Sequence, residues 1–479
     1  MNHEIVIDYQ KKLKQNIQIL IENNRLEDAK ELLNQYENII EDDIEIYSMK
    51  SIIAMMEEKM DEAENFLLTG LKIQPFNFDL LYNIAYLYEI KQDYVKAYYY
   101  YKQILYSSNT EILDEIKVKI KDLEKIEEVK ESNERKAPAI TIITWAYNAE
   151  KYIEECIESV LGQSFTDFEW VIIDNASTDK TSDIIKKYSE RDDRIKIFTN
   201  QQNSFLRHSY EERDAINPKC TEYINNLKSE YVCQLDNDDF LHHDFLKILY
   251  CQAKRYHADL AIGGTEMFVD KNPNRRGRRT PPDFQTNNIF EVGDIFPQIY
   301  GSIRTIWGRL IKTPIYINGR KYVKENHINL LNANDTMLSL IHLKLSKSFV
   351  SVHKVLHYYR IREDSQYHSQ VDKNRYLDYL KIYRESKKLL KSWNKLNDTN
   401  RRFIEQVLYY SMKDCMDIAA MARNVKIEDR IKVIAIILSN QDIRKILNKN
   451  GLLIHMFNDA VHALNTIAED DRKRIEPMS

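Results

Sequence analysis

Three aspartates lie within four positions of one another in the stretch "CQLDNDDFLHHDFL", Cys233 to Leu246. They are Asp236, Asp238 and Asp239, and they follow an apolar run that predicts a β-strand. Carboxylates gathered at the end of a strand can hold a hard divalent cation, because Mg²⁺, Mn²⁺ and Ca²⁺ prefer oxygen ligands. An EF-hand calcium loop is excluded, since its glycine and its later glutamate are absent. The alternative is an aspartate that only caps the helix expected to start near His243.

The elements around this cluster alternate between strands and helices. Strand-like runs "AITIITW", "EWVIID", "RIKIFT" and "EYVCQLD" are separated by amphipathic stretches such as "EKYIEECIESVL" and "DKTSDIIKKY". This alternation predicts βαβ units, and therefore an α/β domain with a mainly parallel sheet. Ligands of such sheets bind at the carboxyl ends of the strands, where "YNAE", "DNASTD" and "LDNDDF" all fall. The acidic cluster is therefore expected at the edge of a nucleotide site.

The N-terminal part of the chain predicts only helices. Its alanines Ala29, Ala63 and Ala97 recur every 34 residues, and Pro75 lies where a repeat often ends its second helix. This is the period of tetratricopeptide repeats, in which a small residue lets two antiparallel helices approach closely. Residues 1–133 are therefore predicted to form a tetratricopeptide-like domain that could hold a protein or peptide acceptor. A generic helical bundle is the alternative.

The composition is that of an ordinary globular protein. Of 479 residues, 43% are hydrophobic and 30% are charged, with a net charge of −5. Nothing in this balance favours nucleic acid as a partner. No apolar run approaches the roughly 20 residues of a membrane span, and the N-terminus does not resemble a signal peptide, so a cytoplasmic protein is expected. The five cysteines form no CxxC pair and indicate neither disulfides nor zinc.

A known family matches these motifs. The segment "AITIITWAYNAEKYIEECIESVLGQSFTDFEWVIIDNASTDKTSDII", followed by "SEYVCQLDNDDFLHHDFL", closely resembles glycosyltransferase family 2. The resemblance is strong over about residues 138–265 and weaker over 300–370, through "TIWGRLIK", "NDTML" and "YYRIREDS". It implies a GT-A fold for residues 138–371 and transfer of a sugar from a nucleotide-sugar, with inversion at the anomeric carbon. Residues 372–479 are predicted to be a helical region for packing or for homo-oligomer formation.

The resemblance implies roles for the acidic cluster. Asp236 is expected to bind the donor ribose, and Asp238 a divalent metal, Mn²⁺ or Mg²⁺, on the diphosphate. Such an ion neutralises the leaving group as the glycosidic bond breaks. Asp239 extends the metal site by orienting the waters of the metal, and Asn237 is placed with the donor-binding residues.

Tyr147 and Asn175 occupy the positions that grip the base in the family. The family has an aspartate at the second position, which accepts a hydrogen bond from the uracil N3–H. The side-chain carbonyl of Asn175 can still accept that bond, so UDP is the expected nucleotide. Trp145 is a further departure, since the family has a small residue or proline there.

The later motifs supply the remaining candidates. Asp335 in "NANDTMLSL" matches the catalytic base, which takes the proton from the acceptor nucleophile; a helix N-cap is the alternative. Arg360 and Arg362 in "YYRIREDS" are expected to reach the diphosphate. His357 or His368 could ligate the metal. The arginine-rich run "NPNRRGRRTPPD" is expected to be a loop, either one that binds an anionic acceptor or closes over the donor, or a plain surface loop.

Together these observations predict a metal-dependent transferase that uses a UDP-sugar. The attached repeats favour a protein or peptide acceptor, for example flagellin. The first alternative is a glycosyltransferase for cell-surface polysaccharide or teichoic acid. The second is a non-catalytic scaffold with a degenerate transferase domain.

Overall fold

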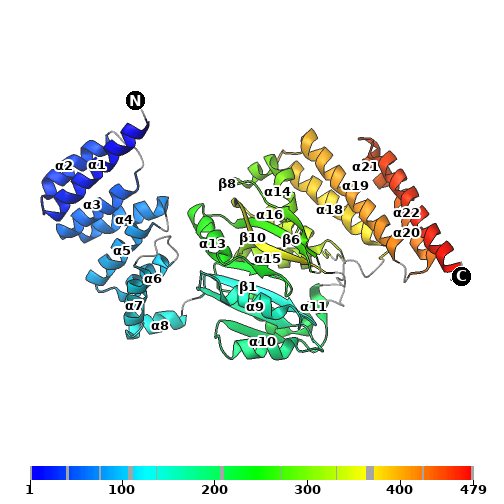
Figure 1. The fold of residues 1–479 in the computed structure, drawn as a ribbon, viewed down its shortest axis with the longest axis horizontal. Coiled ribbons are helices and arrows are strands. Elements are labelled where there is room, and N and C mark those ends of the chain that lie inside the picture. The colour runs from blue at the N-terminus through cyan, green and yellow to red at the C-terminus, as the bar shows by residue number, and fades with distance from the viewer. Residues whose placement is uncertain are drawn as a thin grey trace. The chain divides into compact units, whose positions relative to one another are not determined.

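The chain divides into two compact units, Met1–Ala137 and Pro138–Ser479, which are described separately (Figure 1). The computed structural model describes residues 3–38, 43–74, 77–105, 112–135, 137–204, 210–270, 272–328, 330, 332–362, 372–422 and 425–475. Pro75 and His368 lie outside these ranges.

The first unit is helical, as its sequence pattern predicts. Its helices are α1 (His3–Glu22), α2 (Leu26–Glu37), α3 (Glu45–Met56), α4 (Met60–Ile73), α5 (Phe78–Ile90), α6 (Tyr94–Ile104), α7 (Leu113–Leu123) and α8 (Glu127–Arg135). The three alanines of the 34-residue period, Ala29, Ala63 and Ala97, are fully buried in α2, α4 and α6. In each of these three helices, the buried position of the repeat thus carries only a methyl group, which lets a neighbouring helix approach closely.

The turns between paired helices repeat with the same period. Asn24, Glu58 and Gln92 have φ values of 57°, 58° and 57°. After each of them, a backbone N–H donates to a carbonyl five residues earlier: Arg25 to Leu20, Lys59 to Ala54, and Asp93 to Tyr88. This is the Schellman arrangement that ends a helix. The 34-residue period is thus present in the backbone, and the tetratricopeptide assignment remains a prediction.

The second unit is built on one mixed sheet. Its strands are β1 (Ile140–Ala146), β2 (Phe168–Asp174), β3 (Ile195–Thr199), β4 (Tyr231–Gln234), β5 (Phe240–Leu241), β6 (Leu260–Val269), β7 (Asn272–Arg279), β8 (Phe284–Thr286), β9 (Arg309–Lys312) and β10 (Phe349–Ile361). The order is β3-β2-β1-β4-β9-β6-β10-β5, with β7 beside β6 and β8 beside β10. The predicted α/β class is confirmed.

The parallel part of the sheet covers β3, β2, β1 and β4. β9 then enters antiparallel to both β4 and β6, and β6 pairs in parallel with β10. The sheet is therefore mixed, and its parallel half holds the motifs that the sequence shows best. β5 pairs antiparallel with β10, opposing Leu241 to His357 and Phe240 to Tyr358. This pairing brings the end of β10 beside the acidic cluster.

Helices cover the sheet and extend beyond it. They are α9 (Ile153–Leu161), α10 (Thr181–Ser189), α11 (Tyr210–Ile216), α12 (Pro218–Asn225), α13 (Phe245–Arg255), η2 (Ile289–Asp294), α14 (Phe296–Ile303), α15 (Thr313–Glu325), α16 (Asn334–Leu345), α18 (Arg375–Ser392), α19 (Asp398–Met421), α20 (Ile427–Ser439), α21 (Gln441–Asn448) and α22 (Leu452–Ile475).

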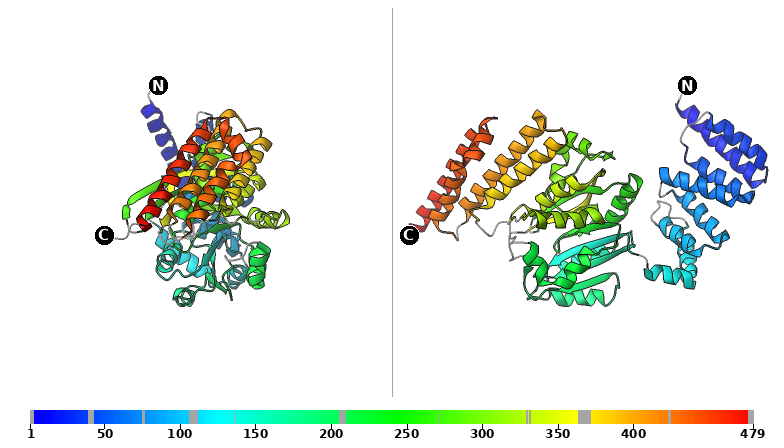
Figure 2. Two further views of the ribbon diagram at one scale, coloured as in Figure 1. Left: turned by 90° about the vertical axis from the view of Figure 1, so that its right-hand side faces the viewer. Right: turned by 180° about the vertical axis from the view of Figure 1, so that it is seen from behind.

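The C-terminal helices share a core with the sheet. One cluster of buried apolar side chains runs from Val171 in β2, through Met337 in α16, to Ile467 in α22. The helices from α18 to α22, yellow to red in Figure 2, run side by side. Because the core is continuous, these helices stabilise the sheet as well as one another.

Two further expectations concern the whole chain. Within the described ranges, no helix combines the length and the apolar composition that crossing a membrane requires. All five cysteines are free thiols, and four of them are buried. They contribute to the packing of the second unit.

Candidate functional site

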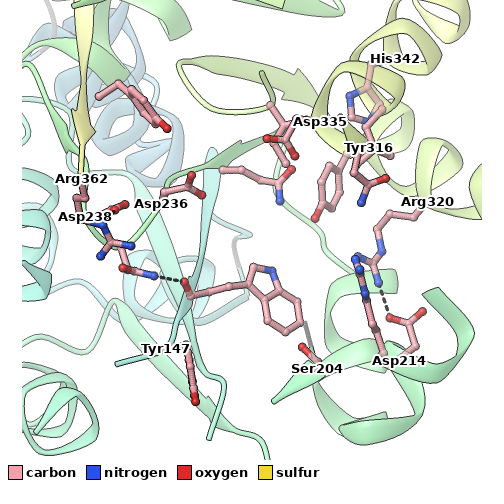
Figure 3. Close-up of a pocket in the computed structure, with 18 residues that line it drawn as sticks. Tyr147, Ser204, Asp214, Asp236, Asp238, Tyr316, Arg320, Asp335, His342 and Arg362 are labelled. Atoms are coloured by element: carbon pink, nitrogen blue, oxygen red, sulfur yellow. Dashed lines mark hydrogen bonds and ion pairs between the residues drawn. The ribbon is translucent and has the colours of Figure 1, made fainter. Parts of the chain in front are cut away.

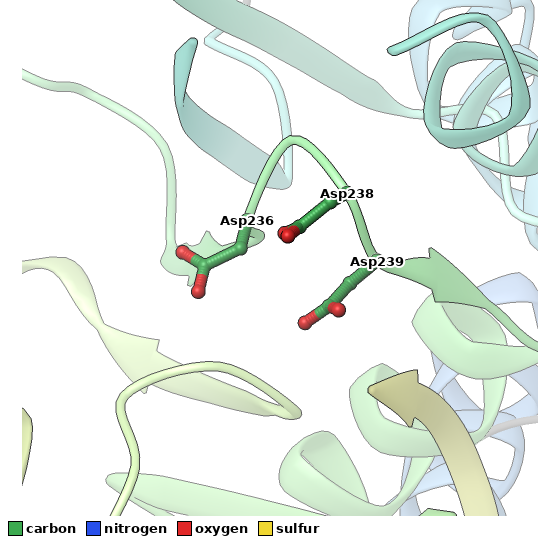
Figure 4. Close-up of side chains that lie close together, drawn as sticks. All are labelled: Asp236, Asp238 and Asp239. Carbon is green, nitrogen blue, oxygen red and sulfur yellow. The ribbon is translucent and has the colours of Figure 1, made fainter. Parts of the chain in front are cut away.

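The three aspartates gather on the turn after β4 (Figure 4). Each offers one carboxylate oxygen, and the three oxygens lie within 4.8 Å of one another. The following helix, α13, has Asp244 at its N-cap, so none of the three caps it. Their shared position is instead suited to a cation, since like charges this close repel.

The charges in this turn depress one another's ionisation. Burial, followed by the charge of Asp238, raises the pKa of Asp239 well above its ordinary value. Asp236 is open to solvent within the pocket. Partial removal from water there, followed by the charges of Asp239 and Asp238, likewise raises the pKa of Asp236. A divalent cation would offset this repulsion and favour the ionised forms.

The donor set fits a hard cation. It consists of carboxylate oxygens alone, which suit Mg²⁺ or Mn²⁺. Oδ2 of Asp239 is buried and has no hydrogen-bond partner among the described residues. It lies 3.2 Å from Nε2 of His357, without hydrogen-bond geometry. An acceptor left in this state is stabilised by a nearby positive charge.

His357 lies behind the turn and not in the pocket. It is fully buried, and its ring stacks on Trp307 at 4.7 Å between centroids. Burial lowers the pKa of His357 to about 3, against a smaller opposite effect of Asp238, so the imidazole is neutral. His357 therefore packs beside Asp239 without lining the pocket. The other predicted histidine ligand, His368, lies outside the described residues.

Arg360 holds the acidic turn from behind. Its backbone N–H donates to Oδ1 of Asp239 at 2.9 Å, and its Nε donates to the carbonyl of Asp238 at 2.9 Å. The remaining guanidinium nitrogens pair with Asp270 and Glu155. Since the side chain is engaged with the protein and does not line the pocket, the expectation that it reaches the diphosphate is corrected.

Arg362 does line the pocket. Its Nε lies 3.0 Å from Oδ2 of Asp238, and its guanidinium lies 5.2 Å from the ring centre of Tyr152. This arginine stays the candidate for contact with a donor diphosphate.

The pocket above the strand ends has a volume of about 360 Å³ (Figure 3). It is lined by Trp145, Tyr147, Ser204, Arg213, Asp214, Gln234, Asp236, Asn237, Asp238, Ile306, Tyr316, Arg320, Asn334, Asp335, Leu338, His342, Tyr359 and Arg362. The acidic turn and Tyr147 lie toward one end, and Arg320 and His342 toward the other.

The residues predicted to grip the base separate in the structure. Tyr147 lines the pocket, whereas Asn175 is fully buried outside its lining. The Asn175 carbonyl already accepts hydrogen bonds from Asn200 and from both the N–H and the hydroxyl of Ser204, at 2.8 to 2.9 Å. This differs from the expected bond to uracil: Asn175 fixes Ser204, which itself reaches the pocket.

Asn237 and Trp145 join two strand ends. Nδ2 of Asn237 donates to the carbonyl of Trp145 at 2.8 Å. This bond ties the acidic turn to the end of β1, and both side chains line the pocket. Trp145, which departs from the family pattern, is therefore part of the pocket lining.

Asp335 lies in the first turn of α16 and lines the pocket. The N-cap position belongs to Ala333, with a φ of 57°, so the capping alternative for Asp335 does not hold. Burial raises the pKa of Asp335 to about 6, and the nearby Arg309 opposes this rise. A carboxylate with such a pKa is suited to general-base chemistry near neutral pH.

The arginine-rich run forms a strand rather than the expected loop. β7 pairs antiparallel with β6. Arg276 and Arg278 both bind the buried Glu266, at 2.7 and 2.6 Å. The side chain of Arg275 lies outside the described part of the chain, and Arg279 packs under Gly301. The pairing with Glu266 explains two of the four charges structurally.

Sequence reasoning missed the end of the pocket formed by α11, α15 and α16. Arg213, Asp214, Tyr316, Arg320 and His342 all line it. They come from helices outside the matched motifs, and each looks like an ordinary helix residue in sequence. The buried polar character of Arg320 and His342 is visible only in the folded chain.

Comparison with known proteins identifies the class of this site. Residues 141–313 match the family model described as Glycosyl transferase family 2. This segment contains β1, the acidic turn and β9, so this part of the chain is a glycosyltransferase family 2 domain, which defines an enzyme class. The resemblance seen in the sequence is confirmed for these residues.

Individual relatives cover only parts of the chain. Glycosyltransferase GlyA of Streptococcus pneumoniae serotype 4 is 27% identical over 47% of this chain and 31% of its own length. A putative teichuronic acid biosynthesis glycosyltransferase, TuaG of Bacillus subtilis, is 34% identical over 21% of this chain and 36% of its own. The chain therefore spans about a third of the length of these relatives.

A solved structure is also similar. Residues 1–349 of TarS from S. aureus, in complex with UDP-GlcNAc, match with a TM-score of 0.43 at 20% identity. The match covers 70% of this chain and 91% of the other.

Proposed function

We propose that this protein transfers a sugar from a nucleotide-sugar, with a UDP-sugar as the expected donor, to a hydroxyl group of a cell-surface polysaccharide. The observation that carries the proposal is the pocket itself. A cluster of three carboxylates lies toward one end, and a fourth carboxylate with a raised pKa lies between the two ends. An inverting transfer needs a site for the leaving diphosphate and a base for the acceptor. The carboxylate cluster would supply the first, and the fourth carboxylate the second.

The acidic turn is assigned to the donor. Asp238, with Asp239 beside it, would hold Mn²⁺ or Mg²⁺, which supplies charge neutralisation for the departing diphosphate. Asp236 and Asn237 line the same end of the pocket and would position the ribose. Arg362 adds a positive charge that a diphosphate can pair with.

Tyr147 is assigned to the base, at the end of β1. Its aromatic ring offers a stacking surface, and Ser204 offers a hydroxyl that can donate or accept. Asn175 acts indirectly, because its three bonds to Asn200 and Ser204 fix the wall of this region.

Asp335 is assigned as the base. In a single displacement, the acceptor hydroxyl oxygen bonds to the anomeric carbon as the bond from that carbon to the diphosphate breaks. The Asp335 carboxylate takes the hydroxyl proton, and the diphosphate leaves with the bonding electrons. A pKa of about 6 leaves the carboxylate ionised at neutral pH and still able to accept a proton.

The choice of polysaccharide over protein as acceptor rests on two observations. The name of TuaG, 34% identical to part of this chain, refers to teichuronic acid biosynthesis. The family match at residues 141–313 does not include the N-terminal helices, on which the expectation of a protein acceptor depended. A transferase acting on surface polysaccharide is therefore the better supported alternative.

The proposal is tested by donor binding and turnover. Thermal shift with UDP-glucose, UDP-N-acetylglucosamine, UDP-galactose and GDP-mannose, each with and without Mn²⁺, should show metal-dependent stabilisation by one UDP-sugar. The stabilising donor should then be hydrolysed slowly, with release of UDP. If no donor stabilises the protein and none is hydrolysed, the chain is a scaffold and not a transferase.

A further inference from the structure

The pocket has an arm on the side away from the acidic turn (Figure 3). We use "the arm" for the part lined by Asp214, Tyr316, Arg320 and His342. Tyr316 and Arg320 lie on α15, four residues apart and so on one helix face, and His342 lies on α16. None of these residues has a role in the donor site described above.

His342 is the residue that points to a ligand. It is 1% exposed and lines the pocket. Neither of its ring nitrogens has a hydrogen-bond partner among the described residues. Buried polar groups in folded proteins are almost always paired, so an imidazole left in this state at a pocket wall indicates a missing partner.

The ionisation state of His342 defines what that partner offers. Burial, followed by the charge of Arg309, lowers the pKa of His342 to about 3. The ring is therefore neutral at physiological pH, with one nitrogen donating and the other accepting. A hydroxyl group can pair with whichever nitrogen faces the pocket, because it can accept from the protonated nitrogen or donate to the unprotonated one, whereas an anion can pair only with the protonated nitrogen.

The local structure makes room for this ring. A Cβ on Gly319 would lie 2.7 Å from Cδ2 and Nε2 of His342, so a larger residue there would displace the imidazole. Tyr316 lies beside it, with 6.2 Å between ring centroids. The imidazole of His342 therefore packs directly against Gly319 of α15, in a space that a larger side chain would fill.

Arg320 and Asp214 add a polar pair to the arm. Nη2 of Arg320 donates to Oδ1 of Asp214 at 2.8 Å, and both residues line the pocket. Arginine brings planar donors and aspartate brings acceptors, a combination that fits the adjacent hydroxyl groups of a sugar ring.

The position of Asp335 assigns the arm to the acceptor. Asp335 lies between the acidic turn and the arm in the same pocket. In an inverting displacement, the nucleophile approaches the face opposite the leaving group. With the diphosphate at the acidic turn, the nucleophile and its sugar must come from the far side of Asp335.

We propose that the arm is a saccharide subsite for the acceptor, in which the ring of His342 hydrogen-bonds a sugar hydroxyl. The inference rests on the transferase activity proposed above and specifies its acceptor side. It makes His342 a residue that determines acceptor specificity.

Methyl glycosides serve as probes for this subsite. Binding of the methyl β-glycosides of glucose, galactose, N-acetylglucosamine and glucuronic acid is measured by saturation-transfer NMR, with UDP and diamagnetic Mg²⁺ present. At least one glycoside should bind the wild-type protein. When the nucleotide-sugar that the protein hydrolyses is added intact, mass spectrometry should detect the glycosylated form of that glycoside. His342→Phe should weaken that binding at least about tenfold, and His342→Gln, which can still donate and accept, should weaken it less.

Lys344→Gln is the matched control, because Lys344 is exposed on the same helix and does not line the pocket. It should bind the probe like the wild type. The inference is overturned if no glycoside binds up to about 50 mM, if the bound glycoside is never glycosylated, or if His342→Phe binds as tightly as Lys344→Gln. Because UDP release in water is measured without a glycoside, failure of the transferase activity is recognised separately.

Discussion

At the scale of single residues, the proposed function assigns the chemistry of the pocket to Asp238 and Asp335. Asp238 shares its turn with two other carboxylates and is paired with Arg362 at 3.0 Å. Asp335 lies on α16, outside that turn, and the charge of Arg309 opposes the rise in its pKa that burial causes. Replacing each carboxylate is therefore expected to impair a different property of the protein.

Asp238→Asn should remove metal-dependent activity without unfolding the protein. The change keeps the side-chain size but removes the charge that attracts a divalent ion, so donor turnover should fall about a hundredfold or more. Mn²⁺ affinity is measured by calorimetry and turnover by UDP release. Asp244→Asn, which alters a carboxylate of the same segment that bonds Ser164 outside the pocket, is the control and should stay active. Full wild-type activity after exhaustive EDTA treatment would contradict the metal assignment.

Asp335→Asn should retain donor binding and lose turnover by about a hundredfold or more. The wild-type rate should also depend on pH. Since a base works only when deprotonated and the pKa of Asp335 is about 6, the rate should rise with pH through about 6 and level off above it. Rates of UDP release between pH 5 and 8 check this. A flat profile, or wild-type turnover in the variant, would assign the base elsewhere.

Strand β10 decides the shape of the acidic turn at the scale of elements. Its pairing with β5 places Arg360 against the turn, where backbone and side chain together bind Asp238 and Asp239. Two residues later, Arg362 faces the pocket. The two arginines of "YYRIR" look alike in sequence. Only the sheet pairing shows that Arg360 binds the acidic turn and that Arg362 faces the pocket.

Arg360→Met should lower both stability and metal affinity. The variant loses the side-chain bonds to the Asp238 carbonyl, Asp270 and Glu155, so the free energy of unfolding should fall by about 1–3 kcal/mol. Mn²⁺ binding should weaken about tenfold or more, because the turn is no longer fixed. Denaturant unfolding and calorimetry measure the two effects.

Arg362→Met is the matched comparison for that variant. It should weaken UDP-sugar binding, while its free energy of unfolding should stay close to that of the wild type. If both variants are equally destabilised, the division between the two arginines is incorrect.

The two compact units imply separable functions at the scale of the whole molecule. All residues that line the pocket belong to Pro138–Ser479, and this unit has a continuous core of its own. The helices of Met1–Ala137 pack around two separate apolar clusters. Among the described residues, those proposed to bind the donor all lie in the second unit.

Removal of residues 1–137 should leave a folded protein that binds and hydrolyses the donor like the intact chain. The measurement is UDP release, together with light scattering to establish that the truncated protein is monodisperse. A truncated protein that is monodisperse but inactive on the donor would contradict the separation. Transfer to polysaccharide should persist as well; its selective loss would assign acceptor binding to the helical repeats.

The sequence alone determined the features that depend on neighbours along the chain. Alternating strands and helices, the aspartates after β4, Asp335 before an apolar helix and the 34-residue alanine period are all local patterns. Each motif residue sits at a strand end or helix start, and strand ends on one edge of a sheet meet in space. This rule predicts Asp236 and Asp238 at the ligand-binding edge of the sheet, whereas Asp335 is expected in the same site through the resemblance to glycosyltransferase family 2.

Tertiary structure decided which polar groups remain available to a ligand. The Asn175 carbonyl is occupied by Ser204 and Asn200, two arginines of the basic run are bound to Glu266, and Arg360 faces the protein. His342 is buried, and its two ring nitrogens have no hydrogen-bond partner within the described part of the chain. These outcomes depend on the pairing of β2 with β3, of β6 with β7 and of β10 with β5, and on the packing of α15 against α16. Such contacts join residues far apart in sequence, so no local pattern encodes them.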